Sequence, residues 1–358
     1  MNSLRCHYYL DNKITLAKAI AIVCVVIGHS GCPELMRNLI YLFHMPFFFF
    51  IAGYCFKEKY LSDLKTFIVH RIKGLYFPFL KWNIIFIFLH NVFFDLNIYN
   101  AEYGSGNGLI RYANHEYPHL ISAALRFNAS EQLLGVYWFL KSLFLGYVVF
   151  YFTLKIGRNT LLGSGVLLII CLVIDCFSID IPYLGFRTFF PSFFIMTGYI
   201  YRKQIETGFT MKYRKYTLIF GTVVLVIASF FIHTEMLQTH GLMIAVYAVL
   251  AFVGCIMLLI ISDMVVEKKV REKGIVDYIG KHTLSIMTFH FLSFKVVTLA
   301  FIIYNQLPIG MLSTFPVVSR LSPNDMWIIY SCFGIACPLI MYRFYEKIKI
   351  KVIEYTQK

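Results

Sequence analysis

Charged side chains are scarce in this sequence of 358 residues. They make up 15% of the chain, whereas hydrophobic residues make up 59%. A soluble globular domain typically has about 25% charged residues and roughly 45–50% apolar residues. The shortage of charge excludes an ordinary soluble protein, because water leaves no place for so much apolar surface. We therefore expect an all-α polytopic transmembrane helix bundle.

Patterns typical of metal or redox chemistry are also missing. The nine cysteines are scattered, and several lie inside apolar runs, among them Cys24, Cys171 and Cys255. Because none has the spacing of a metal site or a redox pair, we interpret them as small hydrophobic residues and expect no metal. No segment has the composition of a linker or of a soluble domain, so we expect one integral-membrane domain over residues 1–358.

Long apolar runs, in contrast, are plentiful. A membrane-spanning helix needs about 20 mostly apolar residues. Ten runs approach this length, and they cover residues 14–31, 38–56, 75–95, 135–154, 160–177, 184–201, 216–233, 241–262, 282–304 and 326–345. We expect the first run to be a retained anchor, because His29 stands where a lipoprotein cleavage site needs an aliphatic residue.

The segments between these runs differ in charge. Lys and Arg gather in every second segment, whereas the intervening segments together hold only five. This alternation follows the positive-inside rule and predicts ten helices with both termini cytoplasmic. It also explains the net charge of +14 without a nucleic-acid partner. The longest loop, 96–134, is then extracytoplasmic, and its Asn, Tyr, Gly and His suit either sugar contacts or a mobile connector.

Two ionisable residues share the first apolar run. Lys18 and His29 are eleven residues apart, which places them on one helix face about 16 Å apart. Such a face should point into the bundle, away from lipid. Lys18 could instead extend to the interface, and His29 could be a neutral core histidine bonded to a carbonyl. His44 lies at a comparable depth on the next run, where it either faces the same cavity or supports the backbone beside Pro46.

A basic segment precedes the third run. It contains Lys57, Lys59, Lys65, Arg71 and Lys73. One interpretation is topology control and attraction to anionic lipid. A second is a phosphate site for a nucleotide-bearing cofactor, because Arg and Lys at a helix start suit phosphate groups. Other polar residues lie within or beside the apolar runs: Asn83, His90, Lys141, Arg187, His290 and Lys295. His290 is nearest to mid-membrane, where an unpaired polar group is most costly.

The stretches "ITLAKAIAIVCVVIGHS" and "YLFHMPFFFFIAGYCFK" resemble the opening of the acyltransferase 3 family, and most closely its fucose 4-O-acetylase-like branch. That family has a basic residue and a histidine separated by ten residues on its first helix, which Lys18 and His29 match. "WFLKSLF", "FFIMTGYIYRK" and "YIGKHTLSIMTFH" follow in the family's order. Two positions depart from the pattern: Thr15 stands where an Asp is frequent, and Gly74 stands where a second Arg often follows Arg71.

The resemblance implies a multi-pass O-acetyltransferase of the cell inner membrane. It implies acetyl-CoA as the acyl donor and a hydroxyl of an extracytoplasmic or lipid-linked glycan as the acceptor. The nucleotide end of CoA would bind at Lys18, Arg71 and Lys73, with the thioester directed towards His29.

The resemblance gives His29 one of two roles. It acts as a general base, or it is acylated and passes the acyl group on. His44 and His290 are the further catalytic candidates, in orienting or acceptor-side roles.

Two other interpretations remain open. A transporter or flippase of a glycan or small molecule would also need many helices and buried charges, although we find no pair of similar halves. A membrane-bound O-acyltransferase of the other large family, which also uses a histidine, is the nearest enzyme alternative. The sequence does not indicate the acceptor sugar, the acyl group or the oligomeric state.

Overall fold

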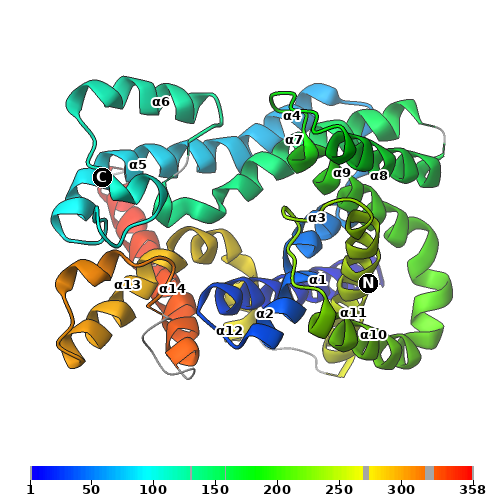
Figure 1. Cartoon of the computed structure of the whole chain (residues 1–358). Helices are drawn as coiled ribbons and strands as arrows, with labels where there is room; N and C mark the ends of the chain where they lie inside the picture. Colours follow the sequence, from blue (N-terminus) through cyan, green and yellow to red (C-terminus); the bar gives the residue numbers. More distant parts are fainter. Residues whose placement is uncertain (1, 130, 158, 269–273, 319–325, 357–358) are drawn as a thin grey trace. The chain divides into compact units, whose positions relative to one another are not determined.

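Every regular element of the described chain is a helix. The computed structural model describes residues 2–129, 131–157, 159–268, 274–318 and 326–356 (Figure 1). Helices account for 79% of the chain, and these ranges contain no strand. The predicted all-α class is therefore confirmed.

The chain forms helices of very different length. The α-helices are α1 (Asn2–His29), α2 (Glu34–Tyr41), α3 (His44–Tyr54), α4 (Leu64–Arg71), α5 (Phe77–Asp95), α6 (Tyr117–Leu125), α7 (Trp138–Ile156), α8 (Thr160–Cys176), α9 (Phe186–Ile200), α10 (Met211–Phe231), α11 (Met243–Lys268), α12 (Ile275–Lys281), α13 (Thr283–Tyr304) and α14 (Met326–Thr356). The 3-10 helices are η1 (Glu58–Leu61), η3 (Gly106–Leu109), η4 (Asn114–Glu116), η5 (Gln132–Tyr137) and η7 (Ile309–Ser313). Two π-helices, η2 (Ile72–Tyr76) and η6 (Tyr201–Thr210), extend α4 and α9.

All ten apolar runs predicted from the sequence fall on helices. Among the described residues, seven helical stretches are long and apolar enough to cross a membrane, and α8 is a shorter apolar helix. The seven stretches are Glu34–Tyr54, Leu64–Asp95, Trp138–Ile156, Tyr213–Phe231, Met243–Glu267, Thr283–Tyr304 and Met326–Lys349. The chain is thus a multi-pass membrane protein, while the count of ten spans and the cytoplasmic termini stay predictions.

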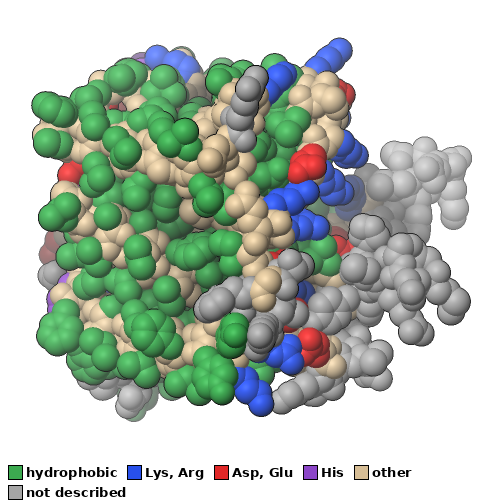
Figure 2. Space-filling model, turned by 90° about the vertical axis from the view of Figure 1, so that its right-hand side faces the viewer, with side chains coloured by type: hydrophobic (Ala, Val, Ile, Leu, Met, Phe, Trp, Pro, Cys, Tyr) green, Lys and Arg blue, Asp and Glu red, His purple; other side chains and the backbone are tan. Residues whose placement is uncertain are grey.

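Many large apolar side chains are exposed on the outside of the helices. Phe231 is 77% exposed and Leu162 is 68% exposed, and dozens of similar residues accompany them. Figure 2 shows hydrophobic side chains over much of the face that it draws. A surface of this kind is stable against lipid tails and not against water.

The contacts divide the chain into two compact units, each built from separate segments. The first unit contains residues 1–21, 34–79 and 138–272, and the second contains residues 22–33, 80–137 and 273–358. Helix α1 contributes its first part to the first unit and its last turns to the second.

In the first unit, α9 packs tightly against α3. A Cβ atom on Gly53 of α3 would lie 1.7 Å from the carbonyl oxygen of Ile195, and one on Gly198 of α9 would lie 1.9 Å from that of Phe50. The two backbones touch at both places, so each position requires glycine. Small residues allow this close approach between membrane helices.

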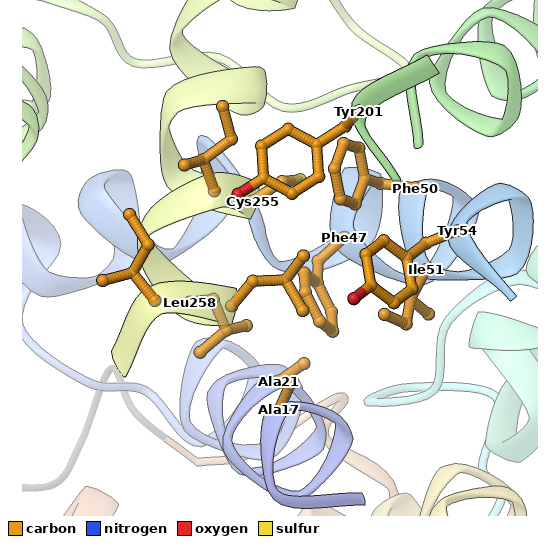
Figure 3. Packing of buried hydrophobic residues seen from close by; sticks show 12 residues of the cluster. Ala17, Ala21, Phe47, Phe50, Ile51, Tyr54, Tyr201, Cys255 and Leu258 are labelled. Atoms are coloured by element: carbon orange, nitrogen blue, oxygen red, sulfur yellow. The ribbon is translucent and has the colours of Figure 1, made fainter. Parts of the chain in front are cut away.

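The core of the first unit is aromatic. Figure 3 shows Phe47, Phe50 and Tyr54 of α3 packed with Tyr201 of η6. Ala17 lies beside them on α1, where its small side chain leaves room for these rings. This packing fixes the ends of α3 and η6, where the charged residues described below are found.

In the second unit, α13 is packed mainly against α14. Gly334 of α14 lies against Phe294 of α13 and against Val26 of α1, and a Cβ there would approach the two side chains to 2.5 and 2.7 Å. The last turns of α1 are therefore held beside α13, which carries His290.

Candidate active site

The second unit brings two of the predicted histidines together. His29 is the last residue of α1, and its ring centroid lies 5.7 Å from that of His290 on α13. His290 is fully buried, whereas His29 is half-buried. One imidazole is therefore accessible to a bound molecule, and the second lies behind it.

The backbone of α13 fixes the orientation of the His290 ring. Nδ1 lies 3.1 Å from the carbonyl oxygen of Ile286 and 3.0 Å from that of Met287. A carbonyl only accepts hydrogen bonds, so Nδ1 carries the proton and the lone pair is on Nε2. Nε2 is buried and has no hydrogen-bond partner within the described ranges. A buried acceptor in this state indicates a group that is reserved for a ligand or for chemistry.

Phenylalanine rings form the walls of this imidazole pocket. Phe291 lies 5.1 Å from the His29 ring, and Phe315 lies 4.6 Å from Phe291. Phe294 meets the His290 ring edge-on at 5.7 Å. Apolar walls exclude water, which strengthens any hydrogen bond that the imidazoles make.

Lys295 is an intramembrane lysine with a structural role. Its ammonium group donates to the carbonyl oxygens of Leu312 and Thr314, both at 2.9 Å. These bonds hold the segment that carries Phe315 against α13. The charge that looked functional in the sequence thus positions one wall of the pocket.

His44 belongs to the first unit. It begins α3, and its Nδ1 donates to the carbonyl oxygen of Ile40 at 2.8 Å, across the break between α2 and α3. The ring also lies 5.0 Å from Tyr41. His44 therefore supports the interrupted backbone, as one of the two sequence interpretations predicts, and its catalytic role stays a prediction.

Arg71 is the centre of the predicted phosphate site, at the end of α4. Its guanidinium carbon lies 3.7 Å from the centre of the Tyr147 ring, with Phe67 at 5.4 Å and Tyr60 at 5.8 Å. Nε is buried and has no hydrogen-bond partner among the described residues. The rings hold the guanidinium plane by cation–π contact, an arrangement that preserves a fixed fork for an anion.

The other predicted donor-site residues surround this part of the first unit. Lys73 is exposed on η2, two residues after Arg71. Lys18 is half-buried on α1, within electrostatic range of Cys55 at the end of α3, as is Lys57. The basic segment and Lys18 thus share one region of the first unit.

The comparison with protein families is decisive. The acyltransferase domain of the acyltransferase 3 family matches residues 9–343. The chain belongs to the acyltransferase 3 family. Comparisons with curated proteins and with solved structures find no match.

This membrane acyltransferase also contains an ionic cluster that the sequence did not predict. Lys13 of α1 lies 2.6 Å from Glu206 of η6 and 3.2 Å from Asp263 of α11. The Tyr54 hydroxyl donates to both oxygens of Glu206, at 2.8 and 2.9 Å. The three charged side chains are no more than 15% exposed. No local pattern indicates such a cluster, because its members are about 50 to 190 residues apart.

A second unpredicted cluster surrounds Glu131 in the second unit. His90 donates through Nε2 to the Ile110 carbonyl at 2.8 Å, and its Nδ1 shares a proton with Glu131 at 3.0 Å. Tyr112 and Tyr99 donate to the same carboxylate, at 2.8 and 3.3 Å. Burial, and then the charge of Glu131, raises the pKa of both tyrosines. The cluster attaches the start of the long 96–134 loop to α5.

Proposed function

We propose that this acyltransferase transfers an acetyl group from cytoplasmic acetyl-CoA to a hydroxyl of an extracytoplasmic or lipid-linked glycan. We place it in the cell inner membrane and in the fucose 4-O-acetylase-like branch of its family. The observation that carries the proposal is the pair of imidazoles at His29 and His290, in an apolar pocket of a chain from a family of acyltransferases.

In the proposed reaction, His29 acts as the general base. It takes the proton of the sugar hydroxyl while that oxygen attacks the thioester carbonyl. The C–S bond breaks, the CoA thiolate leaves, and the proton on His29 passes to the thiolate sulfur. In the second mechanism that the sequence leaves open, the acetyl group first bonds to His29 and then moves to the hydroxyl oxygen.

His290 supports His29 in either mechanism. Its Nδ1 is bonded to backbone carbonyls, so its Nε2 is an acceptor at the same pocket. An acceptor there orients a hydroxyl, or the protonated imidazole of His29, by one hydrogen bond. We therefore assign His290 a positioning role beside the base.

The donor end of the proposal depends on the basic region of the first unit. CoA carries several phosphate charges, and Arg71 is held by aromatic rings with its Nε available. Lys73 and Lys18 would add charge around the same nucleotide. The eleven residues between Lys18 and His29 correspond to about 16 Å of helix, roughly the length of the extended pantetheine arm.

The decisive experiment is His29→Ala in the purified full-length protein, supplied with acetyl-CoA and with glycan from cells that lack the gene. We expect acetyl transfer to fall by about 100-fold or more, because a positioned base typically contributes 10²- to 10⁴-fold. His119→Ala, which removes an exposed histidine of α6, is the matched control and should transfer acetyl normally. A well-folded His29→Ala protein with normal transfer would reject both mechanisms.

A further inference from the structure

A small cavity in the first unit takes no part in the chemistry proposed above. Its volume is about 50 Å³, and its walls include Trp138, Glu235 and His44. A void of this size has room for a few water molecules, or for the hydroxyl groups at one edge of a sugar ring.

The cavity is built from helix ends. Tyr41 ends α2, His44 begins α3, Trp138 begins α7, and Glu235 lies in the segment that joins α10 to α11. The loop charges assign all of these ends to the extracytoplasmic side. The cavity therefore opens towards the side on which a surface glycan is found.

Glu235 gives the cavity a hydrogen-bonding group that the protein does not use. Its carboxylate is half-buried and makes no hydrogen bond or ion pair with any residue that the structure describes. Burial raises the pKa of Glu235, whereas the charges of Arg187 and Arg37 act in the opposite direction. An ionised carboxylate only accepts hydrogen bonds, so the group that it binds must be a donor such as a hydroxyl. A phosphate or carboxylate ligand would be repelled.

The remaining walls suit the other side of such a ligand. Trp138 contributes a large indole ring, and His44 has its lone pair on Nε2 because Nδ1 donates to the Ile40 carbonyl. A sugar ring has an apolar C–H face and an edge of hydroxyl donors. An aromatic surface with a few acceptors complements both features.

We propose that this cavity is a sugar subsite, which binds one pyranose ring of the glycan acceptor. The ring packs on Trp138 and its hydroxyls donate to Glu235. The proposal rests on the proposed function, because it concerns the acceptor of that reaction.

The test separates acceptor binding from acetyl-CoA use. The probe is a mixture of oligosaccharides released from the surface glycan of cells that lack the gene. Two rates are measured for the purified full-length protein: acetyl transfer to these oligosaccharides, and CoA release to water in their absence. We expect Trp138→Ala and Glu235→Gln to raise the KM for the oligosaccharides about tenfold, because one stacking or hydrogen-bonding contact is lost. CoA release and kcat should stay near those of the unmodified protein.

Two further variants make the result specific. Trp138→Phe keeps an aromatic face and should restore most of the affinity, whereas a merely structural tryptophan would not distinguish Phe from Ala in KM alone. Glu102→Gln removes an exposed carboxylate of the 96–134 loop and should change nothing. An unchanged KM in both Trp138→Ala and Glu235→Gln, or a parallel loss of CoA release, would overturn the subsite. If the unmodified protein transfers no acetyl to these oligosaccharides, the proposed function fails first and the subsite fails with it.

Discussion

The ionic cluster of the first unit and the imidazole pocket of the second bury polar groups in opposite ways. At the ionic cluster, Lys13 has two carboxylate partners, and Glu206 also accepts from a tyrosine hydroxyl. At the imidazole pocket, Nε2 of His290 is enclosed by phenylalanine rings and has no partner among the described residues. The first arrangement is electrically complete, whereas the second is complete only when something binds.

This difference separates structural from functional polar groups in a membrane chain. Taking a charge out of water costs several kcal/mol, and a good partner recovers that cost only while both partners are present. A cluster of paired charges therefore gives uniqueness to the packing of α1, η6 and α11. An unsatisfied acceptor lowers stability slightly, and selection keeps it when a bound substrate supplies the missing hydrogen bond.

Breaking the ionic cluster should have the largest effect on stability. Lys13→Met leaves Glu206 and Asp263 buried without their cation, and we expect a loss of about 3–5 kcal/mol. Thermal unfolding of the detergent-solubilised protein measures this loss. Lys281→Met is the matched control, because it breaks the exposed pair between Lys281 and Asp277, which should contribute less than about 1 kcal/mol.

Compensation provides a second check on the same cluster. Adding Glu206→Gln and Asp263→Asn to Lys13→Met removes the two uncompensated charges and should recover part of the lost stability. If Lys13→Met unfolds at the same temperature as the unmodified protein, the contrast between the two regions is not real.

The cluster around Glu131 tests whether the second unit also depends on paired groups. Glu131→Gln takes the charged acceptor away from His90, Tyr112 and Tyr99, and we expect a loss of about 2–3 kcal/mol. The start of the 96–134 loop should detach more often, so trypsin should cleave faster after the exposed Arg111. Glu102→Gln is again the control, and equal cleavage rates in the two variants would contradict the assignment.

The sequence predicted the helices better than it predicted their partners. The expected run 282–304 became α13 (Thr283–Tyr304), because hydropathy is a local property that the chain carries in its own residues. The pairing of His29 with His290 was not predicted, and the sequence placed His29 with His44 instead as one of two possibilities. Packing decides which of two histidines at similar depth meets a third, and a single sequence holds no record of that packing.

Two features of the backbone were also beyond sequence reasoning. The run 184–201 continues as the π-helix η6, and this turn carries Glu206 to the ionic cluster. Gly53 and Gly198 read as ordinary residues of apolar runs, although each lies against the backbone of the opposite helix. In both cases the cause is a contact between distant segments.

The imidazole pocket should respond to substitution in the opposite way from the ionic cluster. His290→Phe replaces the ring by an apolar one of similar shape and leaves no polar group unpaired, so we expect stability to change by less than about 1 kcal/mol. Acetyl transfer should nevertheless fall by tenfold or more, because the acceptor beside His29 is lost. Unfolding temperature and transfer rate are measured on the same preparation. A large loss of stability with transfer in proportion would assign His290 to packing alone.

The smallest expected effect comes from an exposed pair, which extends the comparison into water. Asp63 caps α4 by accepting from the backbone and hydroxyl of Thr66, and these bonds lower the pKa of Asp63. Because the pKa is lower in the folded state, the contribution is present above the unfolded pKa of about 3.9 and is lost as the pH falls through the folded value. Asp63→Ala should therefore lower the unfolding temperature slightly near neutral pH, and this difference should shrink as the pH falls below about 4. Thr66→Val removes the hydroxyl donor alone and should produce a smaller shift. A difference between Asp63→Ala and the unmodified protein that is independent of pH would mean that the carboxylate charge does not stabilise α4, and that solvent already satisfies this helix end.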